Sequence, residues 1–324
     1  MSKILTYIAV QDGKLKRSSL EVLTRCRELA AAQGGSVEAV VLHPDASSFV
    51  DTVQQYGAQT IYIVTHPVFE RHVNMPMVKA LAQVIEQAQP DVVAFSTTEA
   101  VKDILGALAV RTDSAVLSDV SVFEITDGGV EALRPVMASK LMARTRATAD
   151  RVLVSVRSGS YDATEAPTEA AVEEVSFDFD EGNLKLNLRE IVKATTDTVD
   201  LSEARVVVAA GRGVKDEEGK QLIEELASIF GAALGASRAV VESGMFPATA
   251  QVGQTGKVVS PDLYFAIGIS GAVQHTAGMS NSRVIVAINK DADAPIFKYA
   301  TYGLVGDLYK ILPPLIEALK QAKA

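Results

Sequence analysis

The sequence has no tryptophan, one cysteine and four histidines among its 324 residues. Cys26 on its own can form neither an intramolecular disulfide nor a cysteine metal site. Three histidines, His43, His66 and His72, lie far along the chain from His275, so no histidine metal cluster is expected. No Ser/His/Asp or Cys/His set indicates nucleophilic catalysis either. Redox chemistry in this chain would therefore need a bound cofactor.

An excess of positive charge and a long apolar run are also absent. The net charge is -9 and the isoelectric point is near 5.1, with no basic run, which argues against nucleic acid as the main ligand. The apolar stretches fall short of the roughly 18 residues of a membrane span, and Met1 begins no signal segment. We expect no membrane insertion and a cytoplasmic location.

The length favours two domains. Residues 205–324 carry 12 basic and 11 acidic side chains and 13 of the 22 glycines, so all of the net negative charge falls in the earlier part. We predict an N-terminal α/β domain over 1–200, which ends in an acidic linker and serves as a partner interface, and a ligand-binding domain over 201–324.

The first domain alternates β-branched runs with amphipathic segments, which predicts a doubly wound parallel sheet covered on both faces. The turn at 11–14 carries no phosphate-binding glycine fingerprint, so this domain is expected to bind a partner and not a cofactor. Expected strands are 4–10, 37–42, 60–64 and 91–96, expected helices are 19–32, 47–56, 77–88 and 101–111, and 120–125, 130–142 and 151–156 are expected to complete the sheet.

Acidic residues accumulate over 158–200, where periodicity fades. We interpret this segment as the interdomain connection. Part of it can pair as a strand, since Val175, Phe177 and Phe179 alternate with polar residues.

The second domain repeats the alternating pattern, which predicts another doubly wound sheet with its ligand at the carboxyl ends of the strands. Pro313 and Pro314 should kink or split the last helix. Expected strands are 204–210, 233–237, 263–269 and 284–288, and expected helices are 217–230, one from Ser270 and one over about 305–320.

Polar and glycine-rich motifs follow several of these strands. Gly211-Arg212-Gly213 can present backbone N–H groups and a guanidinium to phosphate, although a tight turn with a surface arginine explains it equally well. Ser237-Arg238 is explained by a helix cap beside a solvated arginine. The segment 251–257 (QVGQTGK) has more donors than an ordinary hairpin turn.

Further candidates follow the later strands. Ser270 can cap a helix, and His275 would lie more than a turn inside it, where a structural role is the usual one. Asn289 is placed to bond ribose hydroxyls, and Asp307 needs no ligand because helices often begin with an acid. Together the motifs favour a dinucleotide site, while the absence of GxGxxG and GxxxxGK[ST] disfavours ordinary NAD domains and P-loop enzymes.

The motifs of the second domain resemble those of the alpha subunit of electron transfer flavoprotein. The likeness covers about the last 120 residues closely, whereas the first domain is similar to the family in its α/β pattern alone. The matching text is Ser237-Arg238-Ala239, QVGQTGK (251–257), SPDLY (260–264), GISGAVQH (268–275), AINKD (287–291) and APIF (294–297).

The resemblance implies a C-terminal FAD-binding domain with specific roles for three side chains. Arg238 would lie against the isoalloxazine ring, Thr255 near the flavin N5, and His275 at the C2 carbonyl. A cation or donor there stabilises the negative charge that one-electron reduction brings to the ring. The implied FAD contacts are Arg212, Ser237, Arg238, Val252, Gly253, Gln254, Thr255, Ser270, Gly271, Ala272, Val273, Gln274, His275, Asn289, Asp307 and Leu308.

The resemblance also implies partners. The chain would be an electron carrier without its own organic substrate, paired with a beta subunit that holds AMP. It would take electrons from acyl-CoA and related dehydrogenases and pass them to a membrane-bound electron transfer flavoprotein quinone oxidoreductase. Three alternatives stay open: an electron-bifurcating relative that uses NADH, an NAD-dependent enzyme on a related α/β domain, and a nucleotide-sensing module.

Overall fold

The computed structural model describes residues 2–71, 74–137, 139–180, 182, 184 and 200–323. They form two compact units, the first built mainly of residues before 193 and the second mainly of residues after 192. Each unit has its own parallel sheet and its own core. Among the described residues, no helix has both the length and the apolar character of a membrane span.

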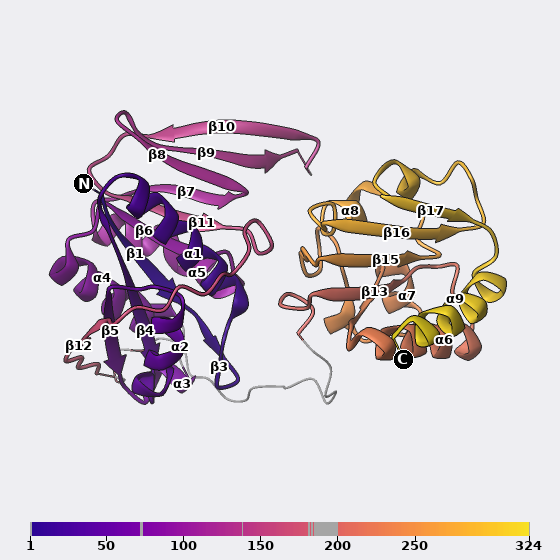
Figure 1. Ribbon diagram of the computed structural model, residues 1–324, viewed down its shortest axis with the longest axis horizontal. Coiled ribbons are helices and arrows are strands. Elements are labelled where there is room, and N and C mark those ends of the chain that lie inside the picture. The colour runs from indigo at the N-terminus through magenta and orange to yellow at the C-terminus, as the bar shows by residue number, and fades with distance from the viewer. Residues whose placement is uncertain are drawn as a thin grey trace. The chain divides into compact units, whose positions relative to one another are not determined.

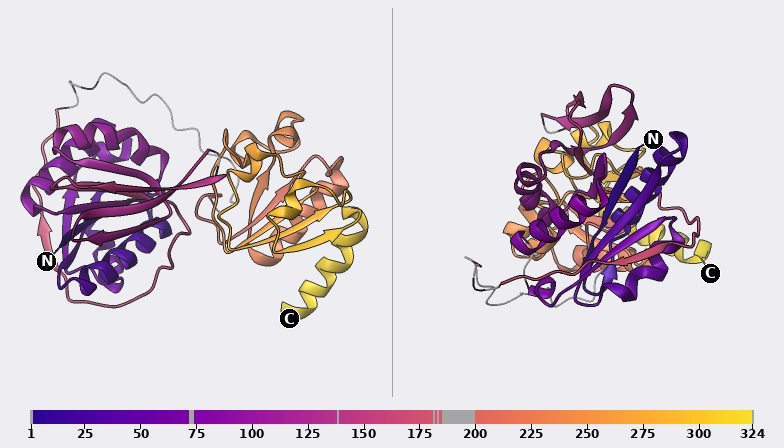
Figure 2. Two further views of the ribbon diagram at one scale, coloured as in Figure 1. Left: turned by 90° about the horizontal axis from the view of Figure 1, so that it is seen from above. Right: turned by 90° about the vertical axis from the view of Figure 1, so that its left-hand side faces the viewer.

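The first unit contains a seven-stranded parallel sheet in the order β12-β5-β4-β1-β6-β11-β7 (Figure 1). Its helices lie on both faces of this sheet, which confirms the doubly wound prediction (Figure 2). The strands are β1 (Lys3–Ile8), β4 (Ser36–His43), β5 (Thr60–Thr65), β6 (Val92–Ser96), β7 (Ala115–Val120), β11 (Val152–Val156) and β12 (Ala171–Glu174), with the small hairpin β2 (Val10–Gln11) and β3 (Lys14–Leu15). The helices are α1 (Arg17–Ala32), η1 (Ala46–Phe49), α2 (Val50–Gln55), α3 (Val68–Arg71), α4 (Asn74–Ala88) and α5 (Glu99–Arg111).

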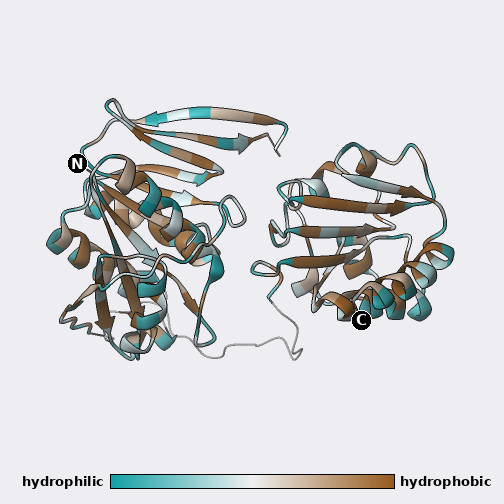
Figure 3. Cartoon of the chain, in the orientation of Figure 1, coloured by the Kyte–Doolittle hydropathy of each residue, from teal (hydrophilic) through white to brown (hydrophobic). Residues whose placement is uncertain are grey.

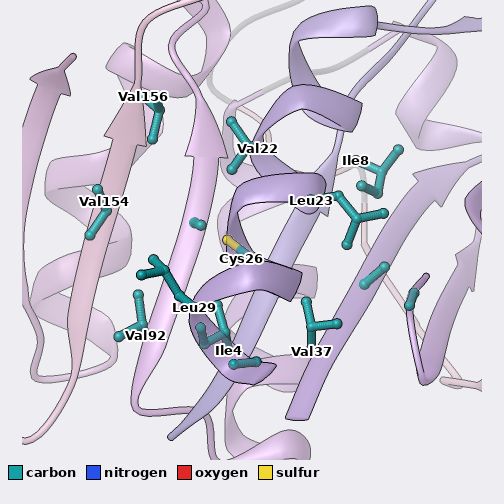
Figure 4. Packing of buried hydrophobic residues seen from close by; sticks show 14 of the residues in the cluster. Ile4, Ile8, Val22, Leu23, Cys26, Leu29, Val37, Val92, Val154 and Val156 are labelled. Carbon is teal, nitrogen blue, oxygen red and sulfur yellow. The ribbon is translucent and has the colours of Figure 1, made fainter. Parts of the chain in front are cut away.

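Alternation along the strands divides the core of the first unit in two. In β1, Ile4 and Ile8 face the α1 side, and Leu5 and Tyr7 face the side of α4 and α5. The buried strands are hydrophobic along most of their length, whereas the helices carry polar residues outward (Figure 3). Cys26 of α1 is fully buried among these aliphatic side chains (Figure 4).

The extended segments after α5 form a second, antiparallel sheet instead of completing the first. Strands β8 (Val122–Thr126), β9 (Gly129–Val136) and β10 (Leu141–Ala147) pair in the order β10-β9-β8. The prediction of one strand over 130–142 was therefore wrong, because the chain reverses between β9 and β10. The seventh strand of the parallel sheet is β7, which lies before the predicted segment 120–125.

Part of the segment interpreted as linker belongs to the first unit. Strand β12 pairs with β5, and lies a few residues before the alternation that suggested a strand over 175–179. Three side chains one turn apart on α4, Lys79, Gln83 and Gln87, each donate a hydrogen bond to residues 173–178 at 2.7–2.9 Å. The ammonium of Lys79 also lies over the Phe177 and Phe179 rings. Most of the later part, from 181 to 199, lies outside the described residues.

The second unit contains a five-stranded parallel sheet in the order β14-β13-β15-β16-β17. Helices α6, α7 and α9 pack on one face, and loops with short helices cover the other. The elements are β13 (Val206–Ala210), α6 (Glu217–Phe230), β14 (Ala233–Ala236), α7 (Arg238–Glu242), η3 (Ala248–Ala250), β15 (Leu263–Ile267), α8 (Val273–Thr276), β16 (Val284–Asn289), η4 (Pro295–Lys298), β17 (Tyr302–Val305) and α9 (Leu308–Lys323).

One expectation for the end of the chain was wrong. Strand β17 occupies the residues where the last helix was expected to begin, and α9 starts at Leu308. The helix runs through Pro313 and Pro314 without being split, and a kink at these residues stays a prediction. Both prolines are exposed, so water can satisfy the backbone carbonyls that lose their helical N–H partners.

Candidate functional site

A cavity of about 830 Å³ lies in the second unit at the carboxyl ends of its strands. The sheet order reverses between β13 and β15, because β14 lies on one side of β13 and the later strands lie on the other. Ligands of open α/β sheets bind at such a switch point. The cavity is within the size range of small-molecule and cofactor sites.

Glycines let the two loops at the switch point approach closely. Gly211 N donates to the Ile267 carbonyl at 2.7 Å and Gly213 N donates to the Gly268 carbonyl at 3.0 Å. A Cβ at Gly268, whose φ is +65°, would lie 2.8 Å from Cα of Gly213. Side chains here would force the loops apart. Because the glycines have none, the backbone itself forms this part of the cavity wall.

The loop 251–257 forms another part of the wall. Two of its N–H groups donate to neighbouring elements: Val252 N to the Ala236 carbonyl of β14 at 2.9 Å and Gln254 N to the Gln274 carbonyl of α8 at 2.7 Å. Gly253 has φ +140°, and a Cβ there would lie 2.6 Å from the Gln274 oxygen. The loop is therefore a fixed part of the wall and not a free hairpin.

An ion pair holds the end of this loop. Lys257 Nζ lies 3.0 Å from Oδ1 of Asp200, which also accepts hydrogen bonds from the backbone N–H and the hydroxyl of Ser202. Burial opposes ionisation of Asp200, but these donors and the Lys257 charge outweigh it and hold the pKa of the carboxyl well below its usual range.

Three cations on the cavity wall have no ion-pair partner in the part of the chain that the structure describes: Arg212, Lys215 and Lys290. They are exposed and can bind an incoming anion. Arg238 differs, because its Nε lies 2.7 Å from Oε1 of Glu242, one turn later on α7, and both side chains line the cavity.

The first turn of α9 is joined to the start of α6 at the cavity rim. The Tyr309 hydroxyl donates to Oδ1 of Asp216 at 2.8 Å and accepts from the Lys215 N–H at 3.1 Å. Asp216 also caps α6 by accepting from Gly219 N, and this bond, followed by that from Tyr309, lowers the pKa of its carboxyl. Asp307 accepts from Tyr309 N at 3.1 Å, as expected for an acid at a helix start.

His275 is the most buried ionisable side chain of the cavity wall, at 6 % exposure. Its Nε2 lies 2.9 Å from the hydroxyl of the fully buried Tyr264, and its Nδ1 is buried without a hydrogen bond among the described residues. Burial lowers the pKa of His275 to about 4, although the backbone of Val252 acts in the opposite direction. The imidazole is therefore neutral near pH 7.

The predicted helix cap at Ser270 was wrong. Helix α8 begins at Val273 after Ala272, without a side-chain cap, so His275 is the third residue of a short helix and not more than a turn inside a long one. A close backbone approach explains the late start. Gly271 has φ +82°, and a Cβ there would lie 2.2 Å from Ile296 N.

Asn289 connects two strand ends. Its Nδ2 donates to the Ile269 carbonyl at 2.8 Å, and its Oδ1 accepts from Asp291 N at 3.0 Å. The amide thus already has partners within the protein, although each of its atoms has capacity for a further bond.

Most of the residues expected at the site come together at this one cavity. Its wall includes Arg212, Ser237, Arg238, Val252, Gly253, Thr255, Ser270, Ala272, Gln274, His275, Asn289, Asp307 and Leu308. Gln254, Gly271 and Val273 lie beside wall residues in the chain but do not line the cavity themselves.

Sequence reasoning missed several wall residues. Lys215, Glu242 and Tyr309 line the cavity but belong to no glycine-rich motif. A usable signal existed for Glu242, since it lies four residues after Arg238 and such a spacing predicts an ion pair on a helix. Lys215 and Tyr309 meet through the packing of α6 and α9, which local sequence does not encode.

Residues 4–180 match the family described as "Electron transfer flavoprotein domain", and residues 200–280 match "Electron transfer flavoprotein FAD-binding domain". The chain is also similar over almost its whole length to "Electron transfer flavoprotein subunit alpha" of Bacillus subtilis, with 40% identity over 319 residues and 98% of each chain covered. It belongs to the electron transfer flavoprotein alpha-subunit family.

Two further relatives show how wide the likeness is. "Electron transfer flavoprotein subunit alpha" of Mycobacterium leprae is 39% identical over 328 residues, with 100% of each chain covered. "Acryloyl-CoA reductase electron transfer subunit beta" of Anaerotignum propionicum is 33% identical over 352 residues, covering 99% of this chain and 96% of that one.

The cavity of this electron transfer flavoprotein subunit fits FAD. Arg212, Lys215 and Lys290 supply positive charge for a pyrophosphate, and the glycine loops bring backbone close to the bound group. The buried Nδ1 of His275 lacks a partner among the described residues, so a bound group can supply one. In that same part of the chain, no three His, Cys, Asp or Glu side chains gather as metal ligands.

Proposed function

We propose that this chain is the FAD-binding alpha subunit of a heterodimeric electron transfer flavoprotein. It carries single electrons from acyl-CoA and related dehydrogenases to a membrane-bound quinone oxidoreductase, in the cytoplasmic compartment, and has no organic substrate of its own. The observation that carries this proposal is the cavity at the β13/β15 switch point, within the unit that matches an FAD-binding domain.

FAD supplies the one-electron chemistry when it is bound. The protein's part is to bind and orient it. Arg212 and the glycine loops would hold the phosphates, and Ser237 and Asn289 would offer hydroxyl and amide groups. Residues 252–255 and 270–275 would surround the ring and ribose. Asp307 and Leu308 close the wall at the start of α9.

Two wall residues set the electrostatics of the ring region. Arg238 contributes a permanent positive charge that is partly balanced by Glu242. His275 contributes a neutral hydrogen-bond donor, because its pKa of about 4 keeps the imidazole uncharged near neutral pH. Both favour added negative charge on a group in the cavity. Thr255, which accepts a hydrogen bond from Gln251 at 3.0 Å, has its own hydroxyl proton available for the ring.

The first unit serves assembly in this proposal. It has the layered architecture of a nucleotide-binding domain but carries no glycine fingerprint after β1. Its surface is proposed to bind the beta subunit, which holds AMP. Domain limits of 1–200 and 201–324 are proposed with this division of labour.

The test is co-expression with the electron transfer flavoprotein beta subunit of the same organism. We expect a yellow 1:1 heterodimer in ultracentrifugation with one FAD and one AMP, whose flavin is reduced by an acyl-CoA dehydrogenase with its substrate. The chain expressed alone should be poorly soluble or poor in flavin. A well-behaved, flavin-saturated monomer would contradict the assembly, and a heterodimer free of flavin would contradict the site.

A pair of matched variants assigns the flavin to the cavity. Arg212→Ala should weaken FAD binding roughly 10- to 100-fold, since a hydrogen bond to a charged group is lost. Arg205→Ala removes an arginine of the same unit that pairs with Asp262 at 2.8 Å outside the cavity wall. This control should bind FAD as the unaltered protein does.

A second candidate function is delivery of electrons within an electron-bifurcating or reductase complex. The likeness to a relative named as an electron transfer subunit of acryloyl-CoA reductase favours it. In the bifurcating form the partner would carry a second FAD and accept hydride from NADH. Two FAD per heterodimer, no AMP, and flavin reduction by NADH would select this form.

An NAD-dependent enzyme is disfavoured by the chemistry of the cavity. Such an enzyme needs a base beside the ring, for which His275 is the candidate. With a pKa of about 4 its neutral form is a weak base near pH 7, and its Nε2 already bonds Tyr264. A sensing module without redox work has no specific observation in its favour.

A further inference from the structure

Tyr264 and His275 form a buried polar pair between a core of the second unit and the cavity wall. Tyr264 is the second residue of β15 and is 0 % exposed, between Val207 of β13 and Ile285 of β16 in the sheet register. Two neighbouring strands thus fix its backbone. Its hydroxyl lies 2.9 Å from Nε2 of His275, the histidine of the cavity wall.

The two neutral tautomers of His275 differ in how many buried polar groups of the pair they leave without a hydrogen-bond partner. If the tyrosine O–H donates to Nε2, then Nδ1 carries the ring proton, and Nδ1–H is the one polar group of the pair without a partner in the described residues. If Nε2–H donates to the tyrosine oxygen, then both the phenolic O–H and the Nδ1 lone pair lack partners. Each unsatisfied buried group costs free energy, so the first arrangement is favoured.

We propose that Tyr264 is a positioning residue that holds His275 in the Nδ1–H tautomer by donating its hydroxyl hydrogen to Nε2. The ring then keeps one donor, Nδ1–H, for an acceptor on a group bound in the cavity. That this group is FAD rests on the proposed function, whereas the tautomer assignment does not.

The charge states of both partners agree with this arrangement. Burial raises the pKa of Tyr264 far above its ordinary value, so the phenol keeps its proton. Burial lowers the pKa of His275 to about 4, so the imidazole does not take a second one near pH 7. The pair is therefore a neutral O–H···N hydrogen bond.

The experiment is long-range ¹H–¹⁵N correlation NMR of the full-length protein labelled with ¹⁵N-histidine. The two ring nitrogens of a neutral histidine have distinct shifts that identify the protonated one, and loss of a signal in His275→Gln assigns His275. The spectrum of the unaltered protein at pH 7 should show His275 as the Nδ1–H tautomer. An Nε2–H tautomer in that spectrum would overturn the proposal without any variant.

Tyr264→Phe then tests the cause. Without the hydroxyl, the tautomer ratio should shift toward Nε2–H by roughly 2- to 10-fold, as expected for the loss of one ordinary hydrogen bond. Tyr7→Phe is the matched control, since Tyr7 is a buried strand tyrosine of the first unit, and it should leave the His275 signals unchanged. An unshifted Nδ1–H tautomer in folded Tyr264→Phe would show that another group fixes the ring and would overturn the role of Tyr264.

The proposed function is tested separately by titrating the same samples with FAD. If His275 contacts the flavin, its ring signals move on binding and Tyr264→Phe weakens binding. Signals that stay in place would count against the flavin role of His275, while the tautomer result decides the inference about Tyr264.

Discussion

Nζ of Lys257 lies 3.0 Å from Oδ1 of Asp200, and this ion pair joins the start of the second unit to the loop that forms part of the cavity wall. The loop residues Val252, Gly253 and Thr255 all line the cavity. The pair therefore connects the place where the chain enters the unit with the place where a cofactor would be held.

Asp200→Asn should lower the free energy of unfolding of the second unit by about 1 kcal/mol at pH 7, because the partly exposed ion pair is lost while Ser202 can still donate. FAD affinity should fall roughly fivefold, the equivalent of the same free energy. The pKa of Asp200 is depressed in the folded state, so the stabilisation by its charge is complete above its ordinary pKa and is lost as the pH falls toward the folded value. The difference between variant and unaltered protein in urea unfolding should shrink in acid.

The control for this variant is Asp262→Asn, which removes the ion pair to Arg205 in the same unit but outside the cavity wall. It should leave FAD affinity unchanged. An equal loss of affinity in both variants would mean that general destabilisation is responsible.

Gly253→Ala should weaken FAD binding by at least tenfold. A Cβ at this position would lie 2.6 Å from the carbonyl oxygen of Gln274, so either the 251–257 loop or helix α8 must move. Gly244→Ala is the matched control, because Gly244 also has a positive φ, +78°, but nothing lies within 4 Å of the added carbon. The control should cost about 1–2 kcal/mol of stability from backbone strain and leave FAD affinity intact. Fluorescence quenching of free FAD on binding measures both affinities.

Much of this site could be predicted because it lies at strand ends, where short motifs are informative. The run before Gly211 is a buried strand, and the glycines after it mark a close backbone approach. Parallel strands of one sheet bring such motifs to the same edge, so residues far apart in the chain were expected together. The α/β fold of both units, each with a parallel sheet, followed from the same alternation of strands and helices.

The elements that escaped prediction depend on tertiary context. All four residues of β17 are exposed, so its sequence lacks the alternation of buried and exposed residues that predicts a strand. Strand β12 is a four-residue edge strand, also exposed throughout, and forms because β5 offers a free edge. The late start of α8 depends on contact between Gly271 and η4, which is distant in sequence.

Arg238→Ala should lower the one-electron reduction potential of the bound flavin by roughly 60 to 130 mV, because a hydrogen bond from a charged group is lost. A tenfold change in the equilibrium constant of a one-electron reduction corresponds to about 59 mV. Arg238→Lys should restore part of the loss, because an ammonium lacks the planar guanidinium. Glu242→Gln should shift the potential upward, since it removes the carboxylate that pairs with Arg238. Photoreduction with a reference dye measures each potential. Unchanged potentials in all three variants, with FAD still bound, would place Arg238 away from the ring.

The buried imidazole of His275 should make the flavin-free protein less stable in acid. Its folded pKa of about 4 lies below the ordinary 6.5, so between these values the unfolded chain binds a proton that the folded chain does not. Stability therefore falls as pH falls through this window, by roughly 2 kcal/mol between pH 7 and pH 5 from this group. His275→Gln should remove that part of the pH dependence in urea titrations. His43→Gln, in the first unit, should not alter it for the second unit.

The burial of Cys26 has a practical consequence for physical measurement. This cysteine, the only one in the sequence, is 0 % exposed, and burial raises the pKa of its thiol to about 12, so it does not react with maleimide or nitroxide reagents in the folded protein. Cysteines introduced at Val110, 87 % exposed in the first unit, and Tyr302, 65 % exposed in the second, would then be the reactive thiols. Pulsed electron spin resonance between two such labels would give the distribution of distances between the units without any background cysteine having to be removed.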